Sequence, residues 1–281
     1  MREQVTHKTL DEERALYNLE HADVLDCTFA GPRDGESALK EARDVTVERC
    51  SFSLRYPLWH AQGYRLRRCT LDELTRAAIW YAGDGEAEDC TLHGIKCLRE
   101  CDRTTLRRCH IQSPEFAWRC RKVQVEDCDL VSEYPFFESR DLDIEGLRMQ
   151  GKYSFQYVEN ARIRHSELDT KDAFWHSRNV TVEHSTVRGE YLGWYSEGLT
   201  LIDCKIIGTQ PLCYCKGLKL VDCTMEGTDL AFEYSEVEAT IRGGILSVKN
   251  PKSGSIVCDG VGEVLYEDSI LDAQGQVIVR A

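Results

Sequence analysis

Apolar and polar positions follow a pattern along this chain that returns about every 19 residues. In each repeat, two apolar residues spaced by two and flanked by Thr, Glu, Arg or Lys predict a short strand with one buried face. Such pairs include Val45 and Val47, Tyr64 and Leu66, Val123 and Val125, Val180 and Val182, and Leu218 and Leu220.

A column made mostly of cysteines follows three positions after the second apolar residue of each pair. Its members are Cys50, Cys69, Cys90, Cys109, Cys128, Leu147, Ser166, Ser185, Cys204 and Cys223. Because a reduced cysteine behaves as a small, readily buried apolar residue, we expect these thiols to fill a core. Another apolar residue follows two positions after the cysteine column. Within a strand, residues on the same face are two positions apart, so the spacing of three between the apolar pair and the cysteine predicts a bend between two strands.

A third strand is expected after a short polar loop, and it carries most of the aromatic residues. Examples are the segments LWH at 58–60, FWH at 174–176 and GWY at 193–195. A unit this short cannot bury its own apolar face, so the repeat predicts stacked coils. We therefore expect an all-β parallel β-helix of about thirteen coils, each with three short strands.

The repeat runs nearly from end to end, which favours one β-helix domain over residues 1–281. We expect an N-terminal cap at 1–21, regular coils at 22–235 and atypical C-terminal coils at 236–281. The steps from Cys27 to Cys50 and from Cys69 to Cys90 are 23 and 21 residues long, so GPRDGESALKE and LDELTRAA contain inserted loop residues. Insertions in a solenoid emerge on the surface and often lie at a binding face.

Charge and composition narrow the choice of partner and compartment. The chain has 35 Lys and Arg against 48 Asp and Glu, a net charge of -13, which argues against nucleic acid and, less strongly, against anionic polysaccharides. No run of 18 apolar residues occurs, so no membrane span is expected. The N-terminal residues MREQVTHKTLDEERAL lack an apolar signal region, so we expect a cytoplasmic protein whose 14 cysteines are mostly reduced.

The chain resembles a bacterial family of pectin-lyase-like β-helix proteins that is known only as a domain of unknown function. The segments that carry the resemblance are FAGPRDGESALKE, SLRYPLWH, ARDVTV, KDAFWH, GEYLGWYS, GTQPLCYCKGL, DLAFEYSEVEA and SVKNPKSG. The resemblance implies a right-handed parallel β-helix. It implies no activity, because the family has none assigned.

Candidate chemistry lies on the third strand, at the tenth position after the cysteine column. This position reads His60, Tyr81, Arg119, Glu138, Tyr157, His176, Tyr195, Tyr214 and Glu233. Because ionisable and phenolic groups make a poor core, we expect this column to face outward. Strand alternation would turn the eighth position, such as Phe155 and Phe174, the same way and bury the tryptophans among small residues. The opposite parity would instead expose tryptophans such as Trp175 and Trp194, and we favour the buried arrangement because large and small residues alternate there. The result would be a face with an aromatic floor and polar tips, suited to a sugar.

The strongest candidate site surrounds His176. Equivalent residues of neighbouring coils lie about 5 Å apart, so His176 should lie between Tyr157 and Tyr195. Asp172 and Glu190 come from nearby loops, and with His176 they are the candidates for general acid–base catalysis. The candidate binding residues are Tyr157, Tyr195, Tyr191, Glu138 and Tyr214. The competing interpretation is that these are hydrogen-bonded ladder residues that hold the loops in place.

We therefore predict binding, or binding and modification, of a carbohydrate or related polar small molecule on this face. The alternative is a structural or interaction module that docks a protein or a second copy of itself. No cofactor and no metal site are expected, because the cysteines and histidines form no convergent set of four ligands. A third hypothesis, a redox role, requires a thiol of low pKa at Cys213 or Cys215. The reaction and the oligomeric state stay open.

Overall fold

The computed structural model describes residues 2–31 and 35–281, which form strands and turns without a helix. It consists of two compact units, Met1–Asp143 and Ile144–Ala281. Both are built from parallel coils, about 14 turns of roughly 19 residues in all. The all-β, right-handed parallel β-helix predicted from the sequence is thus confirmed. Residues 32–34, within the first predicted insertion, lie outside the described residues.

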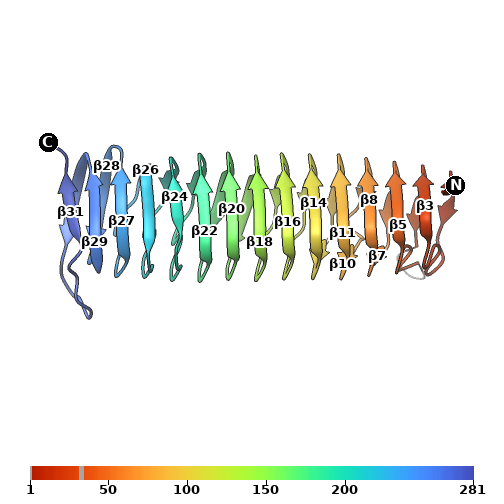
Figure 1. The fold of residues 1–281 in the computed structure, drawn as a ribbon, viewed down its shortest axis with the longest axis horizontal. Coiled ribbons are helices and arrows are strands. Elements are labelled where there is room, and N and C mark those ends of the chain that lie inside the picture. The colour runs from red at the N-terminus through yellow and green to blue at the C-terminus, as the bar shows by residue number, and fades with distance from the viewer. Residues whose placement is uncertain (1, 32–34) are drawn as a thin grey trace. The chain divides into compact units, whose positions relative to one another are not determined.

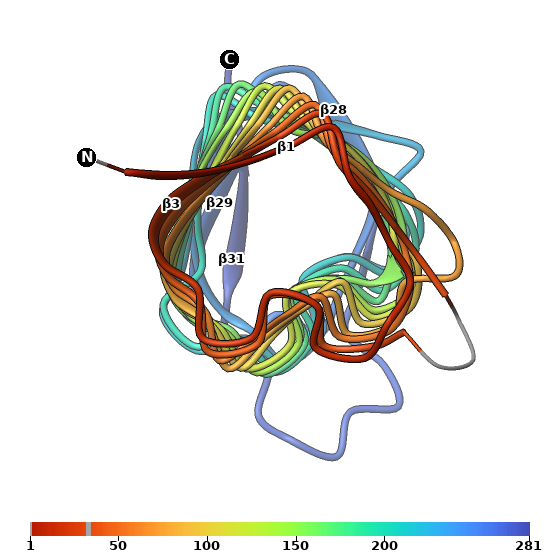
Figure 2. The same ribbon diagram turned by 90° about the vertical axis from the view of Figure 1, so that its right-hand side faces the viewer.

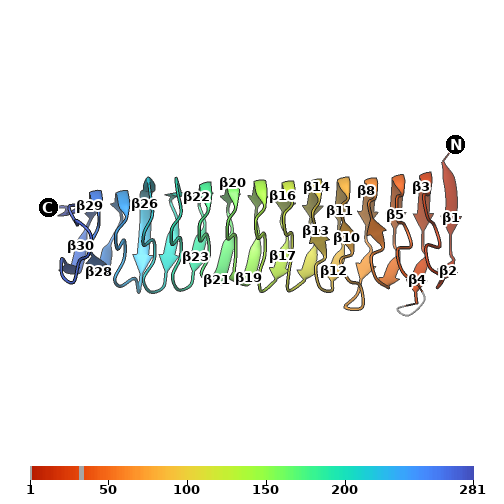
Figure 3. The same ribbon diagram turned by 90° about the horizontal axis from the view of Figure 1, so that it is seen from below.

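In the first unit, two rows of parallel strands build successive sides of the coil, and Figure 1 shows the first row side by side. The first row consists of β1 (Glu3–Thr6), β3 (Glu20–Leu25), β5 (Arg43–Glu48), β8 (Gln62–Arg67), β11 (Gly83–Glu88), β14 (Asp102–Arg107) and β16 (Arg121–Glu126). The second row, visible in Figure 3, consists of β2 (Thr9–Leu10), β4 (Thr28–Ala30), β6 (Ser51–Ser53), β9 (Thr70–Leu71), β12 (Thr91–His93), β15 (His110–Gln112) and β17 (Asp129–Val131). Three two-residue strands form a third, much shorter row: β7 (Leu58–Trp59), β10 (Ile79–Trp80) and β13 (Leu98–Arg99).

The second unit repeats this plan with more variation near its C-terminal end. Its first row consists of β20 (Glu159–Arg164), β22 (Arg178–Glu183), β24 (Thr200–Ile202), β26 (Leu218–Glu226), β27 (Glu236–Ile241), β29 (Ser253–Cys258) and β31 (Gln276–Val279). Its remaining strands are β19 (Arg148–Tyr153), β21 (Glu167–Lys171), β23 (Thr186–Arg188), β25 (Lys205–Ile207), β28 (Gly244–Lys249) and β30 (Gly260–Leu265). Strand β18 (Arg140–Glu145) contains the residues at which the first unit ends and the second begins.

The apolar pairs found in the sequence point into the coils and stack on their counterparts. Val45 pairs with Tyr64 and Val47 with Leu66, and all four side chains are fully buried. The stacking already includes β1, where Glu3 pairs with Ala22, so it begins within the range that the sequence predicted as a cap. Viewed end-on in Figure 2, the coils of each unit superpose around a common interior.

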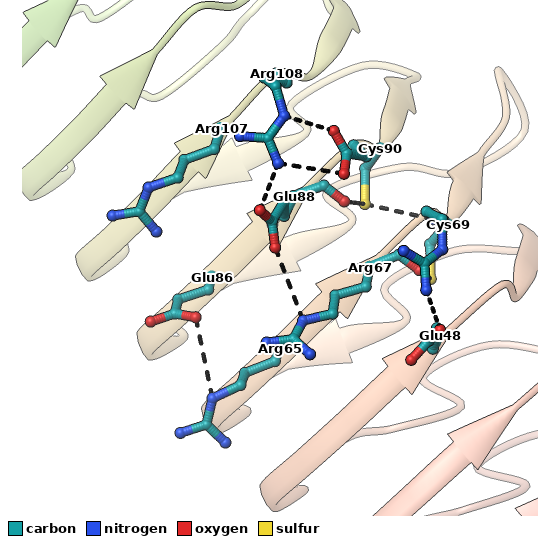
Figure 4. Close-up of polar contacts among 12 residues, drawn as sticks. Glu48, Arg65, Arg67, Cys69, Glu86, Glu88, Cys90, Arg107 and Arg108 are labelled. Carbon is teal, nitrogen blue, oxygen red and sulfur yellow. Dashed lines mark hydrogen bonds and ion pairs between the residues drawn. The ribbon is translucent and has the colours of Figure 1, made fainter.

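The cysteine column is buried as predicted, but its side chains also form hydrogen bonds at the bend. The Cys69 sulfur lies 3.3 and 3.4 Å from the carbonyl oxygens of Val47 and Arg67, either of which can accept its S–H. The backbone N–H of Cys69 donates to the Cys90 sulfur at 3.4 Å (Figure 4). Ser166 plays the same part in the second unit, accepting from the backbone N–H of Leu147 at 3.1 Å. A buried N–H needs a partner, so thiol and hydroxyl are interchangeable here.

Charged side chains of opposite sign face each other from coil to coil on the outer face of the first row. In Figure 4, Arg65 points to Glu86 and Arg67 to Glu88, with closest distances of 4.0 and 3.8 Å. Glu88 also contacts Arg108 of the following coil. Each pair joins equivalent positions of neighbouring coils. Because the pairs are exposed to solvent, they add little to the stability of the fold.

Candidate functional site

The predicted third strand is replaced in the second unit by a stack of turns. Alternate residues of these turns adopt the left-handed conformation, with φ of 58° at Phe155, 57° at Tyr157, 62° at Phe174 and 54° at His176. Backbone hydrogen bonds still join the coils, from the N–H of Tyr157 to the carbonyl of Trp175 and from that of His176 to Trp194, at 2.9 and 3.1 Å. Equivalent residues therefore remain stacked although the segment is not extended.

Four aromatic side chains on these turns, which we call the ring column, are stacked along the outer surface of the second unit. The His176 imidazole lies 5.0 Å from the ring of Tyr157 and 5.1 Å from that of Tyr195, at interplanar angles of 10° and 8°. Tyr214 continues the stack 4.8 Å from Tyr195. The predicted position of His176 between Tyr157 and Tyr195 is confirmed. The side chains of Tyr157 and Tyr195 are 48% and 42% exposed.

The aromatic floor predicted beneath these residues does not exist. Phe155 and Phe174 are fully buried and stack 5.2 Å apart inside the coils, so the eighth and tenth positions point to opposite sides. The prediction failed because it assumed the alternation of an extended strand, whereas the left-handed residues rotate successive side chains differently. Neighbouring rings therefore cover both faces of His176 and of Tyr195, and their edges are the parts left exposed.

The tryptophans were also placed wrongly by strand alternation. Trp175 and Trp194 are half-buried at the surface, with ring centres 5.5 Å apart and an interplanar angle of 5°. Each indole N–H donates to a loop carbonyl of the following coil, that of Tyr191 at 2.6 Å and that of Gln210 at 2.8 Å. These bonds hold the loops against the turns, a role that the sequence analysis missed.

The ring column shares its backbone conformation with the equivalent position of the first unit. Arg119 and Glu138 have φ of 53° and 55°, close to the values at Tyr157 and His176. The conformation therefore belongs to the turn and not to the aromatic residues, and the ring column differs from the first unit in its side chains.

A row of alternating charges runs beside the ring column, two positions further along each coil. Arg178 lies 3.8 Å from both Glu159 and Glu197, and Lys216 lies 3.0 Å from Glu197. The pairing with Lys216 lowers the pKa of Glu197. The sequence showed this row only as scattered charges, because register is needed to bring them together.

The candidate catalytic residues are not brought together. Asp172 and Glu190 belong to a separate cluster with Lys171, whose ammonium group lies 2.9 Å from Glu190 and 5.4 Å from the ring centre of Tyr191. No hydrogen bond or ion pair joins His176 to either carboxylate within the described ranges. The Asp172 N–H donates to the Glu190 carbonyl at 3.0 Å, so these loop residues stack on each other and not on His176.

Burial gives the carboxyl group of Asp172 an unusual environment. The residue is only 7% exposed, and desolvation raises the pKa of its side chain, with the nearby charge of Glu190 adding to the increase. Tyr191 contacts the ring of Trp194 edge-on at 5.5 Å rather than His176. The cluster therefore borders the ring column through Trp194, and its contribution to a site stays a prediction.

The remaining predicted binding residues differ in their surroundings. Tyr214 is half-buried, and desolvation together with the charge of Glu233 raises its pKa to about 12. Glu138 belongs to the first unit, where Arg119 approaches it at 2.7 Å. Glu138 is thus part of an ion-pair column and carries no ring contact of the kind seen at Tyr157.

Metal and thiol chemistry find little support in this structure. Across residues 2–31 and 35–281, no group of three or more His, Cys, Asp and Glu side chains is arranged to hold a metal ion. All 14 cysteines are buried and unpaired. Burial raises the pKa of Cys213, and it raises that of Cys215 to about 11, which is the opposite of what the redox hypothesis requires. Among the described residues, no helix is long and apolar enough to cross a bilayer.

Comparison with solved structures finds β-helix proteins at low identity. A surface adhesin of Streptococcus pneumoniae matches with 7% identity and a TM-score of 0.37, covering 98% of this chain and 81% of the adhesin. The A-module of a mannuronan C-5 epimerase from Azotobacter vinelandii matches with 10% identity and a TM-score of 0.35, covering 100% and 91%. An α-1,3-glucanase catalytic domain matches with 6% identity and a TM-score of 0.35, covering 99% and 64%.

No curated protein matches the sequence significantly. One family model does, and it spans residues 3–279, nearly the whole chain. The chain belongs to the family described as protein of unknown function (DUF3737).

Proposed function

We propose that the ring column of the second unit binds a carbohydrate or a similar polyhydroxylated ligand along the edges of its stacked rings. The observation that carries the proposal is the exposed stack itself, in which Tyr157, His176 and Tyr195 present one polar ring edge per coil. Phenol and imidazole both donate and accept hydrogen bonds, which suits a ligand rich in hydroxyl groups.

The geometry favours edge contacts over stacking of a sugar on a ring face. A ring centred about 5 Å from a parallel neighbour on each side has no free face, as at His176. Hydrogen-bonding groups therefore repeat once per coil along the surface. A chain of sugars laid along the column would meet equivalent groups in succession, so we expect affinity to rise with oligosaccharide length until the ligand spans the rings.

The charge row beside the rings supplies further polar contacts without a strong net field. Glu159, Arg178 and Glu197 alternate in sign, so this surface does not select for a polyanion. The net charge of -13 also opposes polyanionic chains. Neutral oligosaccharides are the class that we expect to bind best.

The proposal is tested on the full chain with an array of neutral and acidic oligosaccharides, followed by calorimetric titration of any hit. The decisive variant is Tyr157→Glu, His176→Arg and Tyr195→Glu combined, which gives the turns a charge pattern like that of the first unit. We expect this triple variant to fold and to lose at least tenfold in affinity.

His184→Ala is the matched control. His184 is also exposed and stacks on His165 at 5.3 Å, but it lies at the bend and not on the turns. Circular dichroism and thermal unfolding check that all variants fold. Absence of any oligosaccharide ligand, or an equal loss of affinity in the control, contradicts the proposal.

A further inference from the structure

The first unit contains a groove that is separate from the ring column. It encloses about 640 Å³, within the range of small-molecule sites. It is lined by Glu73, His93, Gly94, Ile95, Gln112, Pro114, Val131, Ser132 and Glu133.

The floor of the groove comes from neighbouring strands of the second row. His93 of β12 pairs with Gln112 of β15, which in turn pairs with Val131 of β17. Val131 is 50% exposed and Ile95 36%, so apolar side chains are open to solvent here. Together with Pro114 they form an apolar patch, and such patches mark binding surfaces more often than ordinary surface does.

One wall of the groove is the loop inserted between Cys69 and Cys90, which projects from the coils beside β12 in Figure 3. The Thr75 hydroxyl donates to the carbonyl of His93 at 2.8 Å, and the N–H of Leu74 donates to the Asp72 carboxylate at 3.0 Å. The loop also packs closely on Gly94, where a Cβ would lie 2.1 Å from the Thr75 carbonyl oxygen. The wall is therefore preformed, which lowers the entropic cost of binding.

Charge selects the kind of molecule that fits. Glu73 places a carboxylate on the lining, and no Lys or Arg lines the groove in the described part of the chain. Lys96 and Arg99, on the turns that follow, lie 3.6 and 3.7 Å from Glu115, which is not part of the lining. We propose that this groove binds a small organic cation that has an apolar body and an ammonium group.

A cleft in the second unit has charged side chains at the strand positions that correspond to Gln112 and Val131. Asp169, Arg188 and Ile207 occupy successive coils there, and Lys205 joins them around a smaller space of about 350 Å³. Cations balance the carboxylates in that cleft, and no inserted loop closes its side. It serves as the internal control for charge and shape.

The full chain is titrated with three probes that share a six-carbon body: hexylammonium, 1-hexanol and hexanoate. Ligand-observed NMR monitors the binding of each probe. We expect hexylammonium to bind at least tenfold more tightly than hexanoate, with hexanol between them. Glu73→Gln should reduce the affinity for hexylammonium several-fold and leave hexanol unchanged. Val131→Ser should weaken all three probes, since it removes apolar contact.

Ile207→Ser, at the matching strand position of the second unit, is the control and should change nothing. The proposal is overturned if hexanoate binds as tightly as hexylammonium, or if Ile207→Ser weakens binding as much as Val131→Ser. It is equally overturned if Glu73→Gln lowers the affinity for hexanol and hexylammonium alike, because the carboxylate would then act through folding. Thermal unfolding of each variant separates loss of the groove from loss of the fold.

Discussion

Arg119 of the first unit and His176 of the second occupy the same point of the coil with the same backbone conformation, at φ of 53° and 54°. Arg119 lies between Glu100 and Glu138, at 3.4 and 2.7 Å, and forms ion pairs with both. His176 lies between Tyr157 and Tyr195 and stacks on both rings. The turn of each coil thus directs one side chain outward at this position, and the residue type at the position can differ between coils.

The two columns differ in what they contribute. Exposed ion pairs stabilise a fold only slightly, because water already solvates both charges. Stacked aromatic pairs are worth about 0.5–1.5 kcal/mol beyond the area that they bury. Both columns keep bulky residues in a left-handed conformation, so the backbone does not distinguish them. The exposed stack of rings does, and ligand binding is the function that we propose for it.

The largest expected effect concerns the buried side of these turns, where the two units should behave alike. Phe174→Ala and Phe136→Ala each remove a fully buried ring, and we expect each to lower the free energy of unfolding by about 3–5 kcal/mol. Urea unfolding of both variants measures this. Tyr17→Ala, at a residue 52% exposed, is the control. A loss below about 1 kcal/mol for only one of the two variants would show that the buried side of the turns does not contribute equally to the stability of the two units.

A smaller effect is expected at the bend, where the first unit uses thiols and two coils of the second unit use the hydroxyls of Ser166 and Ser185. Ser166→Ala leaves the backbone N–H of Leu147 without its partner, which should cost about 1–3 kcal/mol. Ser166→Cys should recover most of that loss, because the Cys90 sulfur accepts the equivalent bond from the backbone N–H of Cys69. Equal stability of the Ala variant and the wild type would mean that the column acts only by filling space.

The smallest effect is a pH dependence that differs in sign between the units. The hydrogen bond from Arg103 lowers the pKa of Asp84 in the first unit, whereas burial raises that of Asp172 in the second. Asp84 therefore stabilises the fold above the pKa of an unfolded aspartate, about 3.9, and this contribution is lost as the pH falls through its lower folded pKa. Ionised Asp172 does the reverse, because its charge is desolvated.

Asp84→Asn should thus lower the melting temperature at pH 7, and Asp172→Asn should raise it. Both differences should shrink as the solution is acidified toward pH 3, where the carboxyl group of an unfolded aspartate is protonated. Thermal unfolding from pH 3 to pH 7 follows both variants. A melting temperature of Asp172→Asn below that of the wild type at pH 7 would contradict the assigned cause.

Much of the architecture was predictable from the sequence, because a repeat of about 19 residues fixes which side chains meet. The buried strand pairs, the bend at the cysteine column and the contacts of His176 with two tyrosines all follow from stacking one coil on the next. The third strand forms in the first unit as the short strands β7, β10 and β13, but turns replace it in the second unit, since a run such as FWH contains no mark of left-handed backbone. The error propagated to Phe174 and Trp175, whose directions depend on that conformation.

Periodicity by itself determined the neighbours of each side chain along the stack, because equal spacing places equivalent residues on adjacent coils. The tertiary structure alone decided which way those side chains point and which loops reach them. Those features depend on backbone dihedral angles and on how loops pack, as in the separation of Asp172 and Glu190 from His176 and in the wall that Thr75 and Gly94 hold in place. Neither has a periodic signature, so neither could be predicted from spacing.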